Sequence, residues 1–176
     1  AALGQAPLAK AVGHLAELVD RVATAPTATD LKTQIAWYSD EGHVIDDLAL
    51  RTIATAKTAQ DRAAVSRAVG AIYDPWVEQS ARAFQKAAVG SYSGQTGLDV
   101  VAGTCVVYVD ALRYDLATRV ARRLSGLAVV VEPRQAAFPS VTPTGQPAVA
   151  PIRISMAGGA AFDAAVTRLQ ACGVRI

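Results

Sequence analysis

The chain has 176 residues, 52% of them hydrophobic and 18% charged, and its 17 basic and 15 acidic residues leave a formal net charge of +2. Such a composition indicates a folded globular chain and excludes an intrinsically disordered, collagen-like or low-complexity one. The small net charge alone does not indicate nucleic acid as a partner.

The cysteine content and the hydropathy of the sequence indicate the cellular compartment of the protein. Cys105 and Cys172 are too few for a disulfide framework and stand in apolar sequence, so we expect free thiols acting as small hydrophobes in the reducing cytoplasm. No apolar run approaches the roughly 18 residues that a membrane span needs, so we expect no membrane partner. The sequence begins with Ala and its one methionine is Met156, which favours a piece of a longer protein.

Residues 7 to about 90 carry the apolar spacing of three and four residues that is typical of amphipathic helices. Pro26 should end the first of these helices, because proline cannot continue a helix. The three expected helices run from 7 to about 25, from Thr29 or Asp30 to about 53 with a candidate break at Gly42, and from Thr58 or Asp61 to about 90 with a kink or a fresh start at Pro75.

A stretch rich in Gly and Ser, residues 91–97, is the expected boundary between a helical region (1–92) and a second domain (98–176). In the second domain, continuous apolar runs at 104–109 and 127–131 are typical of buried parallel strands. A helix over 112–124 separates them; a short strand at 152–155, a helix at 160–171 and a strand starting at 173 follow. The sequence therefore predicts an α/β fold in which a mainly parallel sheet follows the helical region.

Asp110 directly follows the first predicted strand, at the sheet edge where ligands and metals collect. Its carboxylate suits a divalent ion, but the same position also suits a cap for the helix beginning near Leu112. Asp115 stands four residues before Arg119, which indicates a surface ion pair. The later loop 138–146 has three hydroxyls and two prolines, which is typical of a turn, although a neighbouring metal would make one hydroxyl a nucleophile.

Three other groups of side chains are candidates for a functional or a structural role. The carboxylates around His43, within residues 40–47, indicate either a divalent-ion site or a solvated helix junction. Arginines at 119, 122 and 123 form a basic helix face that is either solvated or in contact with DNA or a partner. Trp37, Trp76 and Phe84 occupy apolar helical positions and are expected in the core.

The string Val106-Val-Tyr-Val-Asp-Ala-Leu-Arg-Tyr-Asp-Leu116, followed by Phe138-Pro-Ser-Val-Thr-Pro-Thr144, resembles the opening of a PglZ domain. Residues 73–85 are similar to the helix that often precedes this domain. PglZ domains belong to the alkaline phosphatase superfamily and occur in phage-defence systems (BREX and phage growth limitation). The resemblance, over about residues 73–151, implies the first part of an alkaline-phosphatase-like α/β domain, a metal-dependent phosphoesterase or nuclease activity, and other defence proteins as partners, with DNA a further partner of the complete protein.

The resemblance also implies roles for single residues. It makes Asp110 a ligand of a divalent metal pair, usually zinc, and places Thr142 at the position of the nucleophilic hydroxyl, with Thr144 as the second choice. Arg113 matches the family string and would either bind an anionic substrate or lie on the helix surface.

The chain departs from the family pattern after Thr142. The other metal ligands of the superfamily include an Asp-His pair and a further His downstream, and no such residues follow here. The two histidines, His14 and His43, lie in the helical region and match nothing in the pattern. We therefore expect this chain to hold no metal tightly and to be inactive. The alternative is a non-catalytic scaffold or interaction module in a defence complex.

Overall fold

The computed structural model describes residues 6–25, 30–92, 105, 107, 109, 111–124 and 126–136. The chain divides into two compact units, one formed by Ala1–Tyr92 with Arg113–Val131 and the other by Ser93–Leu112 with Glu132–Ile176. The first unit contains every described helix. These are α1 (Pro7–Thr24), α2 (Leu31–Trp37), the π-helical turn η2 (Tyr38–Gly42), α3 (His43–Ala54), α4 (Ala59–Ala88) and α5 (Tyr114–Arg123).

The helices of the first unit begin where local chemistry favours a start. Asp30 caps α2, because its side chain accepts a hydrogen bond from the Thr33 backbone N–H at 2.9 Å. Thr58 caps α4 in the same way with the Asp61 N–H at 3.0 Å. Such caps satisfy backbone donors that the first helical turn leaves unpaired. The predicted starts at these residues are confirmed, whereas α4 runs through Pro75 without the fresh start that the sequence allowed.

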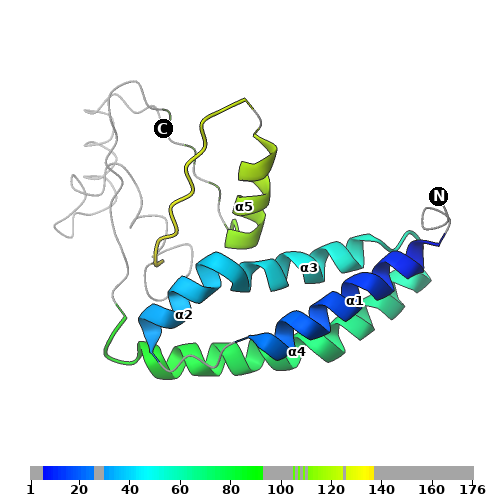
Figure 1. Cartoon of the computed structure of the whole chain (residues 1–176), viewed down its shortest axis with the longest axis horizontal. Helices are drawn as coiled ribbons and strands as arrows, with labels where there is room; N and C mark the ends of the chain where they lie inside the picture. The colour runs from blue at the N-terminus through cyan, green and yellow to red at the C-terminus, as the bar shows by residue number, and fades with distance from the viewer. Residues whose placement is uncertain are drawn as a thin grey trace, which may run out of the picture. The chain divides into compact units, whose positions relative to one another are not determined.

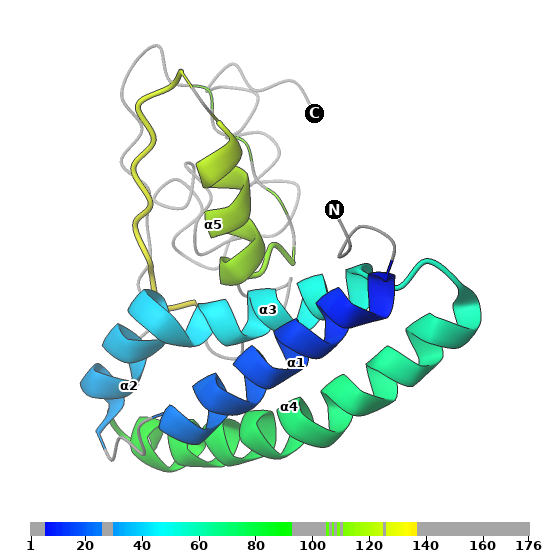
Figure 2. The ribbon, with the colours of Figure 1, turned by 45° about the vertical axis from the view of Figure 1, so that its right-hand side comes forward.

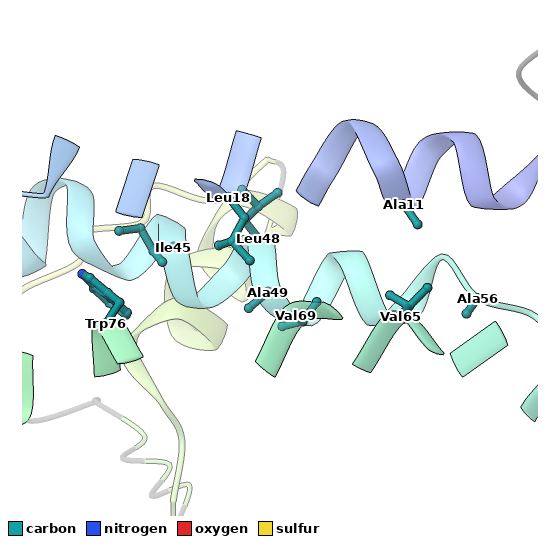
Figure 3. Packing of buried hydrophobic residues seen from close by; sticks show 9 residues of the cluster. All are labelled: Ala11, Leu18, Ile45, Leu48, Ala49, Ala56, Val65, Val69 and Trp76. Atoms are coloured by element: carbon teal, nitrogen blue, oxygen red, sulfur yellow. The ribbon is translucent and has the colours of Figure 1, made fainter. Parts of the chain in front are cut away.

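A three-helix bundle forms the apolar core of this unit. Figure 1 shows α3 running opposite to both α1 and α4, and all three pairs of these helices are in contact. Figure 3 shows their apolar side chains meeting between the ribbons, with Leu18 of α1 and Leu48 of α3 fully buried. Burying a leucine contributes about 1.5–3 kcal/mol relative to leaving it exposed. Trp76 belongs to this core and Trp37 packs against it, as expected, but Phe84 is 36% exposed.

Between α2 and α3 the chain stays helical but widens into the π turn η2. A β-carbon at Gly42, the last residue of η2, would lie 2.8 Å from Cζ3 of Trp37 and 2.9 Å from Cδ2 of Tyr38. Any larger residue at this position would require the two rings to shift. The candidate break at Gly42 is therefore a change of helix type and not an interruption.

The predicted α/β fold with a mainly parallel sheet is wrong. The described part of the chain contains helices and no strand. Residues 127–131, expected as a buried strand, lie outside any strand and are exposed, with Val130 88% exposed. Of the run 104–109, the described residues Cys105, Val107 and Val109 are also exposed and outside any strand, so Cys105 is a free surface thiol.

The physical reason for this error lies in what defines a strand. A continuous apolar run indicates burial, but a strand exists only where a neighbouring segment completes its hydrogen bonds, and the run itself does not carry that information. The helix expected over 112–124 is confirmed as α5. The elements expected at 152–155, 160–171 and 173–176 lie outside the described residues.

Within the second unit, the structure describes only a few residues. Arg134 pairs with Glu132 at 2.8 Å, and Ala111 has a φ of +54°. That backbone angle is uncommon for a residue with a side chain. Among the described helices of the chain, none combines the length and the apolar character that crossing a bilayer requires.

Candidate functional site

Of the four residues to which the resemblance assigns a role, the structure describes one. Asp110, Thr142 and the second-choice Thr144 lie outside the described residues. Arg113 is described and occupies the N-cap position of α5, where it makes no side-chain capping hydrogen bond. The candidate site is therefore built outward from Arg113.

The guanidinium of Arg113 is held by two carboxylates. Its Nε donates to Oδ1 of Asp115 at 3.0 Å and its Nη2 donates to Oδ2 of the same residue at 3.3 Å. Nη2 also lies 3.5 Å from Oδ2 of Asp46 in α3. Asp115 is fully buried, while the Arg113 side chain is 46% exposed. This arginine is thus engaged within the chain, and it links the start of α5 to α3.

Asp46 is the centre of the arrangement. The Tyr38 hydroxyl donates to its Oδ2 at 2.5 Å, and the Tyr73 hydroxyl donates to its Oδ1. The carboxylate is buried, so these donors and Arg113 replace the water that it loses. The partners come from η2, α4 and the N-cap of α5. We call Tyr38, Asp46, Tyr73, Arg113 and Asp115 the Asp46 cluster.

Burial and charge shift the pKa values within the Asp46 cluster. Burial raises the pKa of the Tyr38 and Tyr73 phenols well above their ordinary value, and the hydrogen bonds to Asp46 raise them further because the carboxylate stabilises the protonated phenol. For Arg113, burial acts against the charged form. The hydrogen bonds and charge of Asp115, with the charge of Asp46, outweigh that penalty and raise the pKa of the guanidinium.

A second ion network begins one residue later, at Asp47. Nε of Arg119 donates to Asp47 Oδ1 at 2.7 Å, and Nε of Arg51 lies 2.7 Å from Oδ2. Arg119 also donates from Nη2 to the Asp47 backbone carbonyl at 3.4 Å. The predicted surface pair between Asp115 and Arg119 is therefore wrong, since Asp115 is buried against Arg113 and Arg119 reaches α3. Arg122 and Arg123 are exposed.

His43 completes the surface of α3 that faces α5. It is 5% exposed, and its Nδ1 lies 3.2 Å from the Tyr38 carbonyl, whereas Nε2 has no hydrogen-bond partner. Its ring and the Tyr114 ring form a T-shaped contact, with centroids 5.1 Å apart. Figure 2 shows α5 on the side of α3 opposite α4. The expected solvated helix junction at 40–47 is thus wrong for His43, Asp46 and Asp47, which are buried.

Asp110, which the resemblance makes a ligand of the metal pair, lies outside the described residues, so only the other acidic side chains can be examined for a metal site. No group of three or more His, Cys, Asp or Glu side chains suited to a metal ion occurs among the described residues. The acidic side chains that do gather have their oxygens occupied by phenols and guanidinium groups. Such a set of partners neutralises and fixes carboxylates, which leaves them poor ligands for zinc.

Sequence reasoning missed the Asp46 cluster. It placed the adjacent acids Asp46 and Asp47 in either a divalent-ion site or a solvated helix junction, although apolar residues flank them on both sides. Comparisons with protein-family models, curated proteins and solved structures find no match to this chain.

Proposed function

We propose that this chain is part of a cytoplasmic phage-defence protein of the PglZ kind and that it is not catalytic by itself. Its helical unit is a positioning and interaction module that holds the segment beginning at Arg113. The observation that carries this proposal is the engagement of Arg113 by Asp46 and Asp115. A guanidinium held by two carboxylates is poorly suited to bind an anionic substrate, and well suited to fix one helix against another.

The position of Arg113 in the sequence connects its attachment to the bundle with the proposed metal ligand Asp110. Arg113 stands three residues after Asp110, inside the string that resembles the PglZ family. We propose that the complete protein uses Asp110 as a metal ligand and Thr142 as the nucleophile, and that the bundle restrains the chain next to Asp110. Ala111, with its φ of +54°, lies between the two residues and supports a turn that needs restraint. Other defence proteins, and DNA for the complete protein, are the proposed partners.

The catalytic part of the proposal is tested with a chromogenic phosphodiester, bis(4-nitrophenyl) phosphate, in the presence of zinc or manganese. We expect no turnover by the 176-residue chain above the metal blank. Turnover by this chain that Asp110→Ala and Thr142→Ala both abolish would overturn its assignment as non-catalytic. In the complete protein, turnover that neither substitution changes would refute the roles of Asp110 and Thr142.

The positioning part is tested separately, by hydrogen exchange measured with mass spectrometry. Arg113→Gln should speed exchange of the α5 amides, because the link to Asp46 and the pair with Asp115 are both lost. Arg122→Gln, an exposed substitution on the same helix, is the matched control and should leave exchange unchanged. Equal exchange in the two variants would mean that the bundle does not hold α5 through Arg113.

A further inference from the structure

A groove of about 230 Å³ runs between α3 and α4 and ends at Arg113. Leu50 and Ile53, three residues apart on the same face of α3, and Val69 on α4 form its apolar wall. Ser66 lines it as well. These residues belong to one compact unit, so the groove is a feature of that unit alone.

One end of the groove is polar and carries an excess of negative charge. Asp46, Tyr73, Asp74 and Arg113 line this end. The charge of Arg113 is already balanced by Asp46 and by Asp115 behind it. Asp74 differs from both of these acids, because it is exposed and has no hydrogen-bond or ion-pair partner among the described residues. The groove therefore offers one carboxylate that is available to a ligand.

The absence of a side chain at Gly70 leaves room for the Asp74 carboxylate in the groove. A β-carbon built at Gly70 would lie 3.1 Å from Oδ2 of Asp74, so the acid folds back over the glycine one helical turn earlier. Both residues line the groove. A larger residue at position 70 would displace the carboxylate and fill part of the space.

We infer that this groove binds a linear aliphatic amine, with the alkyl chain along Leu50, Ile53 and Val69 and the ammonium at Asp74. Burial of the alkyl chain supplies the non-directional part of the affinity. The ammonium group offers three donors to a carboxylate that lacks a partner, and such charge-assisted hydrogen bonds are among the strong ones. An aliphatic acid of the same length would meet Asp74 with like charge. This inference is independent of the proposed function.

The test compares two ligands of equal length and opposite charge, hexylammonium and hexanoate, by isothermal titration calorimetry on the 176-residue chain. Hexylammonium should bind at least about tenfold more tightly than hexanoate, which corresponds to about 1.4 kcal/mol. Asp74→Asn should weaken hexylammonium binding and reduce the preference between the two ligands. Asp40→Asn, an exposed acid that does not line the groove, is the matched control and should change neither.

The position of the ligand is tested with Ser66→Leu, which fills the apolar end of the groove and should abolish binding. Circular dichroism checks that each variant keeps its helices. Three results would overturn the inference: hexanoate binding as tightly as hexylammonium, no binding of hexylammonium by the unmodified chain at millimolar concentration, or binding that persists in a folded Ser66→Leu variant. The first two results use the unmodified chain and so do not depend on the folding of a variant.

Discussion

Asp46 shows how a single buried charge joins segments that are distant in sequence. Tyr38 lies eight residues away and Tyr73 lies 27 residues away, yet both donate to its carboxylate. A buried carboxylate that loses its partners keeps its desolvation cost, so each donor matters more than an exposed hydrogen bond would.

Replacing this acid by its amide is expected to destabilise the unit. Asp46→Asn keeps the shape but removes the charge, and its one carbonyl oxygen cannot serve both phenols and Arg113. We expect the free energy of unfolding to fall by about 1–3 kcal/mol. Urea unfolding followed by tryptophan fluorescence measures this. Asp20→Asn, an exposed substitution on α1, is the control, and an equal effect of the two changes would contradict the role given to Asp46.

The two phenols of the cluster predict a loss of stability at alkaline pH. The folded chain keeps Tyr38 and Tyr73 protonated above the pKa of about 10 that a tyrosine has in an unfolded chain. Their contribution is therefore complete below that pH and is lost as the pH rises above it, since the unfolded chain then releases more protons. Urea midpoints measured across this range should fall steeply. A Tyr38→Phe/Tyr73→Phe variant should show a shallower fall, and identical slopes would refute the prediction.

The sequence could not have predicted these residue-scale contacts. Helical spacing identifies partners three or four residues apart, which is why Asp115 was paired with Arg119. The actual partner of Arg119 is Asp47, 72 residues earlier in the chain. The sequence shows Asp46 and Asp47 as two acids flanked by apolar residues, but their burial follows only from the way α5 and α4 pack on α3.

At the scale of elements, α5 is held differently from the other helices. The apolar core draws on α1, α3 and α4, and no residue of α5 belongs to it. The buried residue of α5 is an acid, Asp115, and the described contacts to α3 are ion pairs and ring contacts. An isolated helix of this length is not stable in water, so α5 depends on those contacts.

Ionic contacts make the docking of α5 sensitive to salt. Raising the ionic strength should speed hydrogen exchange of the α5 amides while the core amides of α1 and α4 stay protected, because screening weakens partly exposed ion pairs and leaves apolar packing intact. Arg119→Gln should produce the same change at low salt. If α5 and α4 lose protection together at every salt concentration, the helix is not a separately held element.

The elements themselves were predictable to different degrees. The starts of α2 and α4 follow from Asp30 and Thr58, whose caps act within one turn and can be seen in the sequence. The apolar runs on either side of α5, residues 104–109 and 127–131, gave no such local signal. Their composition suits a sheet, but pairing is a property of two segments, and among the described residues no such pair forms.

At the scale of the whole helical unit, stability rests on the line of contact between α1, α3 and α4. Leu48→Ala should lower the free energy of unfolding by about 2–5 kcal/mol, because a fully buried side chain leaves a cavity. Val12→Ala shortens a side chain that is 63% exposed, and should change the free energy of unfolding by no more than about 0.5 kcal/mol. Thermal unfolding monitored by fluorescence, with both tryptophans in this unit, compares the two. Similar losses would show that the core lies elsewhere.

Because of the π turn η2, the contacts of α2 and η2 depend on the number of residues in this segment more than on most of its side chains. The π turn adds to the helix the extra residue that lets Trp37 face Trp76 while Asp46, on the following helix, faces Tyr38. Deleting one residue between Tyr38 and Gly42 would rotate α2 by about 100° relative to α3. Both contacts would then be lost at once. Insertions and deletions should therefore be tolerated less well here than exchanges of exposed side chains such as Asp40.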